Sequence, residues 1–225
     1  MTGKLYIIAT PIGNLKDITF RAVEILKEVD VIACEDTRVS RRLLDAYDIT
    51  NRVISYHQHS KDAKVDNIIS YLQDGKSVGV ITDAGTPGIS DPGNKLVSLV
   101  YQKLPDCQII PIPGSSAVIA ALSVSGLPTD RYVFFGFMPH KKGKQTMIKQ
   151  ILDNEYTCVF YESSHRIMKT LDMFKNMMPP GAKKQIVVAR ELTKKFETIY
   201  RGNIEQIINN LNQDTTKGEF VVVIK

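Results

Sequence analysis

The sequence of 225 residues has no tryptophan, only three cysteines and no long apolar run. A transmembrane helix needs about 20 apolar residues, and the first residues also lack the apolar core and cleavage site of a secretory signal. Cys34, Cys107 and Cys158 lie far apart without a CxxC pair, which is typical of reduced, buried thiols. A hydrophobic content of 43% excludes disorder. We therefore expect a folded, cytoplasmic protein without membrane contact.

Several familiar ligand-binding signatures are missing as well. Residues 9–14 follow the first predicted strand, but they match neither GxGxxG nor GxxxxGK[ST]. His57 and His59 alternate on a predicted strand with no third ligand nearby in sequence, so we expect no metal site. Asp83 also follows a strand, yet Gly85 stands where an aspartyl phosphotransferase needs its second acid. Dinucleotide, P-loop, metal and phosphoaspartate chemistry are therefore not indicated.

Short apolar runs alternate with amphipathic stretches along the whole chain. Apolar residues recur at i, i+3, i+4 and i+7 in 65–72 and again in 204–211, which predicts two helices. A weaker stripe of Phe20, Val23 and Leu26 predicts a third. The strands expected between the helices are 5–9, 31–34, 53–56, 78–82, 109–112, 132–137, 158–161, 186–189, 198–200 and 220–224. This alternation predicts an α/β fold with largely parallel sheets.

The predicted strands fall five on each side of the segment 111–116. In a chain of this length, two sheets of about five strands are favoured over one sheet of ten. We therefore expect two α/β domains with mixed sheets, residues 1–114 and residues 115–225. The connection between the strands at 186–189 and 198–200 is too short for a crossover helix, which favours an antiparallel hairpin there.

Loops rich in glycine, proline and serine follow three of the predicted strands. The densest is 83–93, directly after the strand at 78–82, and the others are 9–14 and 111–117. The carboxyl ends of parallel strands are where α/β folds bind ligands, and glycine lets backbone amides and carbonyls approach closely. Tight turns alone are the simpler interpretation of each loop. Together the three loops predict a small polar ligand held largely by backbone contacts.

The net charge is +5, and charged residues gather in clusters at the ends of predicted strands. These clusters are 33–38, 140–144, 162–166 and 190–195. Each alone is typical of a solvated surface. Together they predict a face that contacts phosphate groups.

Seven segments, in their order and spacing, carry a resemblance to a known family. They are 9–15, 33–38, 83–93, 113–117, 160–166, 189–194 and 217–220. The chain resembles the tetrapyrrole-methylase superfamily of S-adenosylmethionine-dependent methyltransferases. Within it the chain is similar to the ribosomal RNA small subunit methyltransferase I branch, over nearly its whole length.

The resemblance implies two α/β domains with S-adenosylmethionine in the cleft between them, usually in a homodimer. The N-terminal domain is then on the substrate side and the C-terminal domain on the cofactor side. The implied reaction is 2′-O-methylation of the ribose of a cytidine in the decoding region of 16S rRNA, in the 30S ribosomal subunit. Members of this branch usually carry a helical extension after the last strand, and we expect it to be absent from a sequence that stops at Lys225.

The resemblance also assigns residues to the cofactor. The first domain is expected to contribute Pro11, Ile12, Asp83, Ala84, Gly85, Thr86 and Ile89. The domain junction is expected to contribute Ser116 and Ala117. The second domain is expected to contribute Tyr161, Glu162, Ala189, Leu192 and Gly218.

A ribose hydroxyl is a poor nucleophile while it is protonated, so a general base is expected. The sequence does not single one out, and the candidates at strand ends are Glu35, Asp36, Glu162 and Glu191. Ion pairing with a nearby arginine is the alternative role for each of them. The candidate RNA contacts are Arg38, Arg41, Arg42, Lys141, Lys142, Lys144, Arg166, Lys194 and Lys195.

Two other functions remain open at this point. A methyltransferase for a tetrapyrrole or a modified amino acid would share the cofactor pocket, although the basic clusters favour RNA. A non-catalytic RNA- or nucleotide-binding module would keep the ligand loops but would transfer no methyl group. Cofactor binding and methyl transfer to ribosomal subunits distinguish these functions.

Overall fold

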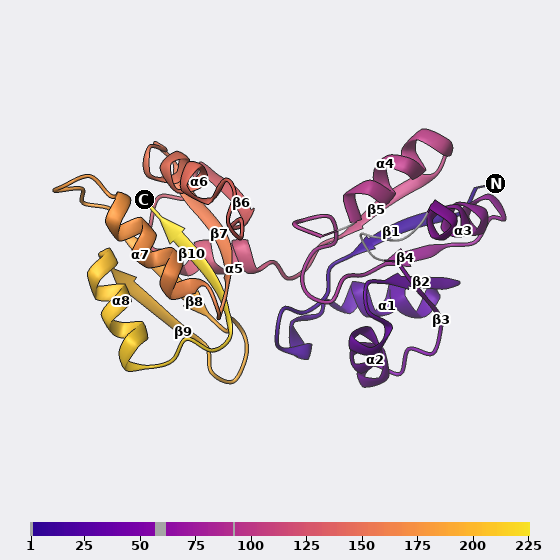
Figure 1. Ribbon diagram of the computed structural model, residues 1–225. Coiled ribbons are helices and arrows are strands. Elements are labelled where there is room, and N and C mark those ends of the chain that lie inside the picture. The colour runs from indigo at the N-terminus through magenta and orange to yellow at the C-terminus, as the bar shows by residue number, and fades with distance from the viewer. Residues whose placement is uncertain (1, 57–61, 92) are drawn as a thin grey trace. The chain divides into compact units, whose positions relative to one another are not determined.

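The structure is a computed structural model that describes residues 2–56, 62–91 and 93–225. By its internal contacts the chain divides into two compact units, Met1–Ser116 (unit 1) and Ala117–Lys225 (unit 2), whereas the sequence predicted a boundary after residue 114. Each unit contains one five-stranded sheet (Figure 1). Among the described residues, none of the helices combines the length and the apolar character needed to cross a membrane.

Unit 1 is an α/β unit whose sheet has the strand order β3-β2-β4-β1-β5, with every pairing parallel. Parallel neighbours need crossover connections, and the helices provide them. Its strands are β1 (Lys4–Ile8), β2 (Val31–Cys34), β3 (Arg52–Ser55), β4 (Val78–Val80) and β5 (Gln108–Ile112). Its helices are the short 3-10 turn η1 (Leu15–Asp17), α1 (Phe20–Glu28), α2 (Thr37–Ala46), α3 (Asp62–Gln73) and α4 (Gly93–Lys103).

Helices cover both faces of this first sheet. Leu72 of α3 and Leu96 of α4 pack with Leu5 of β1 on one face. Leu26 of α1 and Leu44 of α2 belong to the core on the other face. Because both faces are buried, a ligand of unit 1 has to bind at an edge where the strands end, and the carboxyl ends are the usual place.

Unit 2 has a mixed sheet with the order β6-β7-β10-β8-β9. β6 and β7 are parallel, whereas β10 runs antiparallel to β7 and β8, and β8 forms the expected antiparallel hairpin with β9. Its strands are β6 (Tyr132–Phe137), β7 (Thr157–Ser163), β8 (Ile186–Arg190), β9 (Thr198–Gly202) and β10 (Glu219–Ile224). Its helices are α5 (Ala117–Ser125), α6 (Lys144–Leu152), α7 (Ile167–Met177) and α8 (Ile204–Gln213).

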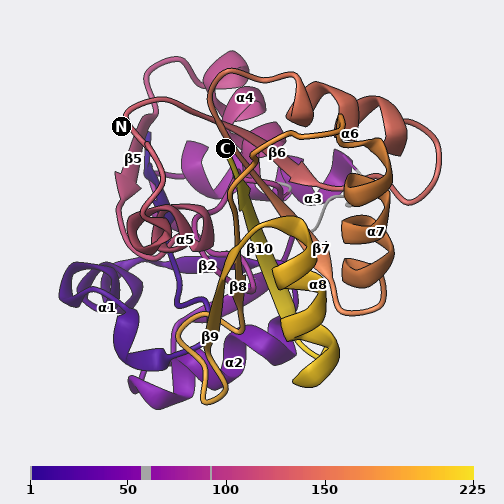
Figure 2. The same ribbon diagram turned by 90° about the vertical axis from the view of Figure 1, so that its left-hand side faces the viewer.

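The main core of unit 2 lies between its sheet and three helices. Figure 2 shows α6, α7 and α8 along one side of the sheet and α5 on the other, where α5 contacts β10 and β7. The rings of Phe160 in β7 and Phe174 in α7 stack with their centroids 5.5 Å apart. The stack fixes α7 against the strand that ends at Ser163.

The ten predicted strands and the α/β class are confirmed, and two details differ. The first sheet is parallel throughout rather than mixed, because helices or long crossovers join all its strands. In α1 the predicted stripe is wrong at Phe20, which is 92% exposed, whereas Leu26 is buried as predicted, together with Ala22. Thr19 caps this helix by accepting a hydrogen bond from the Ala22 amide, so that Phe20 is its first residue.

Candidate functional site

The carboxyl ends of β1 and β4 are joined by a backbone bridge. The Thr10 amide donates to the Gly85 carbonyl at 2.9 Å, and the Gly85 amide donates to the Thr10 carbonyl at 3.0 Å. The Thr10 hydroxyl also donates to the Thr82 carbonyl at 3.0 Å. These contacts unite the loops 9–14 and 83–93 at one edge of the sheet.

The third predicted loop, which follows β5, joins the other two. The Ala9 amide donates to the Ile112 carbonyl at 3.1 Å. The Thr86 hydroxyl donates to the Ser115 carbonyl at 3.1 Å. All three glycine-rich loops therefore form one hydrogen-bonded structure at the carboxyl edge of the first sheet.

Gly85 is required by the backbone at the centre of this structure. Its φ of +85° is a conformation that L-residues rarely adopt. A Cβ there would lie 3.4 Å from Ile12 Cγ2 and 3.7 Å from the Ser115 carbonyl oxygen. These are ordinary contact distances, so it is the positive φ that requires glycine where the loops meet.

Three carboxylates gather at the ends of β2 and β4. Asp83 Oδ1 accepts a hydrogen bond from the Asp36 amide at 3.1 Å, and Glu35 Oε2 accepts one from the Thr82 hydroxyl at 3.1 Å. Hydrogen bonds from the Arg38 side chain and amide lower the pKa of Asp36 to about 2. Partial desolvation raises the pKa of Asp83 and the Asp36 carboxylate adds to this rise, although the hydrogen bond from the Asp36 amide opposes it. Two adjacent carboxylates therefore have pKa values shifted in opposite directions.

The groups exposed at this edge suit a small polar ligand. Backbone amides, carbonyls and threonine or serine hydroxyls form most of it, with Pro11 and Ile12 buried beneath and Ile89 half exposed. Among the residues that the structure describes, no group of three or more His, Cys, Asp or Glu could hold a metal ion. His57 and His59 lie outside the described residues.

In unit 2 the strand register gathers the predicted site segments at one edge. Glu219 pairs with Ser163, and Arg190 pairs with both Phe220 and Thr198. The ends of β7 and β8 and the beginnings of β9 and β10 therefore lie together. We call this the 163/191 edge.

The predicted cofactor contacts at the 163/191 edge differ in exposure. Ala189 and Leu192 are buried, whereas Tyr161 and Gly218 are half-buried. The Tyr161 ring lies 5.1 Å from that of Phe137, centroid to centroid. Ser116 and Ala117 are also half-buried, as the last residue of unit 1 and the first of unit 2.

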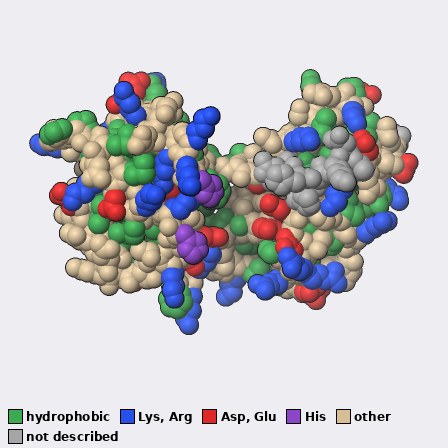
Figure 3. All heavy atoms as spheres, viewed as in Figure 1, with side chains coloured by type: hydrophobic (Ala, Val, Ile, Leu, Met, Phe, Trp, Pro, Cys, Tyr) green, Lys and Arg blue, Asp and Glu red, His purple; other side chains and the backbone are tan. Residues whose placement is uncertain are grey.

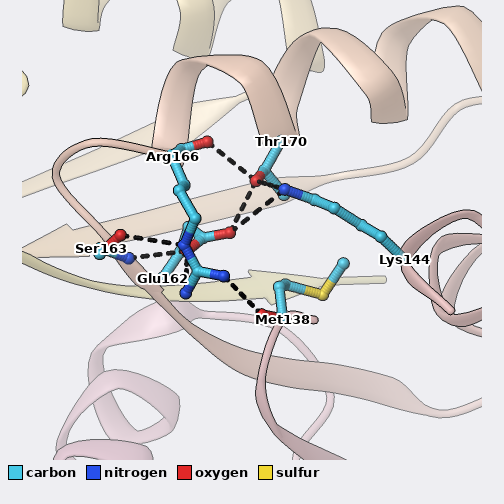
Figure 4. Close-up of polar contacts among 6 residues, drawn as sticks. All are labelled: Met138, Lys144, Glu162, Ser163, Arg166 and Thr170. Carbon is cyan, nitrogen blue, oxygen red and sulfur yellow. Dashed lines mark hydrogen bonds and ion pairs between the residues drawn. The ribbon is translucent and has the colours of Figure 1, made fainter. Parts of the chain in front are cut away.

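Glu162 is the centre of a buried network rather than a free base (Figure 4). Its side chain has no exposed surface and forms ion pairs with Arg166 at 2.9 Å and with Lys144 at 3.6 Å. Its Oε2 also accepts from the Thr170 hydroxyl at 2.7 Å, and Lys144 Nζ donates to that hydroxyl at 2.5 Å. The Arg166 guanidinium continues to the Met138 carbonyl at 2.8 Å.

These contacts correct three sequence-based assignments. Glu162 cannot take a substrate proton while it is enclosed and paired with two cations. Lys144 is only 3% exposed, so it is not an RNA contact. Burial lowers the pKa of Lys144, although the Glu162 carboxylate opposes this effect. The Arg166 side chain is 17% exposed and is bound within the unit, which makes it a structural residue first.

Glu191 is also engaged by neighbours. Its Oε1 accepts hydrogen bonds from Lys194 Nζ and from the Glu219 amide, both at 2.9 Å. Burial raises the pKa of Glu191, but these hydrogen bonds and the Lys194 charge outweigh it, so the pKa is lowered. Lys194 in turn pairs with Glu219 at 2.9 Å. Neither Glu191 nor Lys194 is presented to a ligand as a free charge.

The other predicted RNA contacts lie at the surface. They are Arg38, Arg41, Arg42, Lys141, Lys142 and Lys195, all exposed. Arg38 pairs with Asp36 and Arg41 with Asp45, so two of them already have acidic partners. Figure 3 shows Lys, Arg and His side chains gathered on the face of unit 2 that it presents.

Sequence reasoning missed the roles of Thr10 and Thr82. Each stands just after a strand, and each uses its hydroxyl to tie the carboxyl edge together. The signal was available, because Thr10 precedes Pro11 and Thr82 precedes Asp83 at predicted strand ends. Their partners could not be predicted, since Thr10 and Thr82 are 72 positions apart.

The comparisons with known proteins agree with this architecture. The family Tetrapyrrole (Corrin/Porphyrin) Methylases matches residues 4–208. The structure also resembles diphthine synthase, with a TM-score of 0.75 and 15% identity over 98% of this chain and 89% of that one. It resembles a cobalt precorrin-4 methyltransferase too, with a TM-score of 0.69 and 19% identity over 98% and 94%. The class is thus that of S-adenosylmethionine-dependent methyltransferases with the tetrapyrrole-methylase fold.

Sequence relatives define the group more narrowly. A protein of Synechocystis sp. named ribosomal RNA small subunit methyltransferase I is 44% identical over 99% of this chain and 78% of its own length. The protein of that name from Bacillus subtilis is 39% identical over 99% and 75%. The chain belongs to the ribosomal RNA small subunit methyltransferase I family. The family resemblance and the cofactor predicted from the sequence are therefore confirmed.

Proposed function

We propose that this protein transfers a methyl group from S-adenosylmethionine to the ribose 2′-oxygen of a cytidine in 16S rRNA. The observation that carries the proposal is the identity of 39–44% with named rRNA methyltransferases over at least 98% of the chain. The exposed basic residues of both units support a polyanionic substrate. The predicted homodimer and cytoplasmic location belong to the same proposal.

The groups at the carboxyl edge of unit 1 fit this cofactor. Its sulfonium supplies an activated methyl group, so that the O–CH₃ bond forms as the S–CH₃ bond breaks and the electron pair stays on sulfur. The amides and carbonyls of the loop 83–93 would hold its amino-acid and ribose parts, with Pro11 and Ile12 as the floor. The closely packed glycine loops favour precise positioning, which is the main contribution an enzyme makes to such a displacement. The contacts assigned to unit 2 remain predictions.

The hydroxyl proton has to leave the ribose, and the carboxylates at the ends of β2 and β4 are the candidates. Of the four predicted bases, Glu162 is enclosed and Glu191 is paired with Lys194. Glu35 and Asp36 both lie at the carboxyl edge of unit 1, and Asp36 is bound to Arg38 and has a pKa of about 2. A carboxylate with so low a pKa is a weak base. We propose Glu35 as the proton acceptor, because its Oε2 accepts from the Thr82 hydroxyl, directly before the loop that would hold the cofactor.

The decisive test is transfer of a radiolabelled methyl group to 30S subunits purified from a strain that lacks the enzyme. Label in 16S rRNA, mapped to a ribose, is the expected result. Binding of S-adenosylmethionine without label transfer would instead favour the tetrapyrrole or amino-acid substrate, or the non-catalytic module. Incubation with free 16S rRNA in parallel identifies whether assembled subunit is the substrate.

Glu35→Gln tests the base. We expect kcat to fall about 10²- to 10⁴-fold, the usual contribution of general base catalysis, with unchanged calorimetric affinity for S-adenosylmethionine. Asp36→Asn is the matched control at the neighbouring position. A larger loss of kcat in Asp36→Asn than in Glu35→Gln would reassign the base.

A further inference from the structure

The loop between β8 and β9, residues 191–197, presents an aromatic side chain that the fold does not use. Phe196 is 64% exposed, whereas the buried aromatic residues Phe160, Phe174 and Phe220 form the core of unit 2. Figure 1 shows the β8–β9 connection projecting beyond the ends of both strands. An exposed ring at the tip of a loop contributes little to folding, which indicates that it contacts something outside the unit.

The loop is held in one shape by its own contacts. Glu191 and Thr193 have φ values of 52° and 65°, which non-glycine residues adopt only when surrounding contacts enforce them. The Thr193 amide donates to Glu197 Oε2 at 2.5 Å, and Lys194 Nζ bridges Glu191 and Glu219. The strained backbone and these clamps place Phe196 in a preorganised position, which lowers the entropic cost of binding a partner.

The charges around the ring indicate what that partner is. Lys195 Nζ lies 5.4 Å from the Phe196 ring centroid, and this side chain is itself exposed. Glu191 is paired with Lys194, whereas Glu197 accepts from the Thr193 amide and keeps its negative charge. Beside the ring itself the tip offers a flat apolar surface and the Lys195 cation. Proteins that bind single-stranded nucleic acid combine these two elements, stacking a base on the ring and holding the phosphate with the cation.

We propose that Phe196 is a stacking platform for an unpaired base of the RNA substrate, with Lys195 beside it contacting a phosphate. The proposal rests on the proposed function for the identity of the RNA. Lys195 Nζ lies over one face of the ring at 5.4 Å, and the 64% exposure of Phe196 leaves ring surface open to a base. The loop lies at the 163/191 edge, where the register also places Gly218 and the end of β7.

The test measures affinity for 30S subunits that lack the modification, together with kcat, for three substitutions of Phe196. Removing a stacked base contact costs about 1–3 kcal/mol, so Phe196→Ala should raise Kd and KM roughly 5- to 150-fold. Phe196→Leu keeps apolar volume but has no ring, and it should resemble Phe196→Ala. Phe196→Tyr keeps the ring and should bind within about twofold of the unsubstituted protein. Tyr101→Ala, at another exposed aromatic residue (71%) on α4, is the control and should bind normally.

The dependence on salt separates stacking from charge. Phe196→Ala should leave the slope of log Kd against log salt unchanged, whereas Lys195→Gln should reduce it by about 0.7–0.9, the value for one phosphate contact. Unchanged Kd in Phe196→Ala, or normal binding by Phe196→Leu, overturns the proposal.

Sedimentation of the same variants tests the competing partner, a second copy of this chain. If Phe196→Ala alone converts a dimer to a monomer, the ring belongs to a self-association surface and the proposal fails. If the unsubstituted protein methylates 30S subunits while all Phe196 variants bind normally, only the stacking proposal is lost. If it methylates nothing, the proposed function fails, and binding of a single-stranded RNA containing 2-aminopurine, whose fluorescence reports stacking, still tests Phe196.

Discussion

The two units hold together the loops at the functional edges of their sheets by different interactions. In unit 1, backbone groups do so, through the Thr10–Gly85 bridge and the link from Ala9 to Ile112. In unit 2, long charged side chains do so, with Glu162 enclosed between Lys144 and Arg166. Backbone loops leave amides and carbonyls close to a ligand, whereas a buried ion-pair network fixes positions without offering groups to one.

Substitutions at these two edges also destabilise the protein for different physical reasons. Gly85 is needed because its backbone conformation excludes a Cβ, so the cost of changing it is local strain. Glu162 is needed because the buried Lys144 and the half-buried Arg166 both pair with it, so the cost of changing it is electrostatic. A substitution that strains the backbone loops of unit 1 should therefore leave the ion-pair network of unit 2 intact, and the reverse should also hold.

The largest effect is expected from Glu162→Ala. It leaves Lys144 and Arg166 without their carboxylate in a buried site, which should lower the free energy of unfolding by about 3–5 kcal/mol. Urea unfolding followed by a probe in unit 2 measures this. Glu205→Ala removes the carboxylate of an exposed pair with Lys175 and should cost less than about 1 kcal/mol. A loss below about 1 kcal/mol in Glu162→Ala would contradict the buried network.

The second effect comes from Gly85→Ala. A non-glycine residue at φ +85° costs about 1–2 kcal/mol, and the new Cβ would contact Ile12 at the ordinary distance of 3.4 Å. We expect this loss of stability together with weaker binding of S-adenosylmethionine by calorimetry. Gly181→Ala is the matched control, because Gly181 has φ +78° and nothing within 4 Å of a new Cβ. Gly181→Ala should lose similar stability and keep its affinity for S-adenosylmethionine. Equal affinities in both variants would show that Gly85 is not part of the binding site.

The third effect is a pH dependence in unit 1. Because burial raises the pKa of Asp83 in the folded state, the stability tied to its protonated form is present below about pH 3.9 and is lost as the pH rises through the raised pKa. Asp83→Asn keeps an oxygen that accepts from the Asp36 amide but cannot ionise. It should be as stable as the unsubstituted protein at pH 3 and slightly more stable, by less than about 1 kcal/mol, at pH 7.

Asp36→Asn provides the opposite sign. The pKa of Asp36 is lowered to about 2, so its contribution to stability is present above the unfolded value and is lost only as the pH falls toward 2. Asp36→Asn should therefore be the less stable protein at pH 7, with the difference shrinking in acid. Thermal melting of both variants across this pH range measures the two trends, and parallel curves would refute them.

The smallest effect is expected for the exposed pair of Lys103 with Asp66. The two side chains are 50% and 57% exposed, and their 2.7 Å contact is open to solvent. Lys103→Ala should change the free energy of unfolding by less than about 1 kcal/mol and leave cofactor and RNA binding unchanged. A greater loss would mean that the strength of an ion pair in this protein depends more on a short contact distance than on burial.

Much of the fold and part of the site could be read from the sequence. The alternation of apolar runs with helical stripes predicted all ten strands, because strand and helix periods are local properties. The glycine-rich segments 9–14, 83–93 and 111–117 predicted loops at strand ends for the same reason. The order and spacing of seven segments, which include parts of these loops, also carried the family resemblance. The position of Lys144 carried a local signal too, since Ile148 and Ile151 lie on the same face of α6 at i+4 and i+7 and both are buried.

The tertiary structure alone decided which of these segments meet. Asp36 and Asp83 are 47 positions apart, and they are neighbours because β2 pairs with the distant β4 as well as with β3, the next strand in sequence. Glu162 looked like a candidate base until the packing of α6 and α7 on β7 enclosed it between Lys144 and Arg166. A strand-end acid has the same sequence signature whether it faces solvent or the core. Sequence therefore determined the elements and the kind of chemistry, whereas strand order and helix packing determined which charges are available for it.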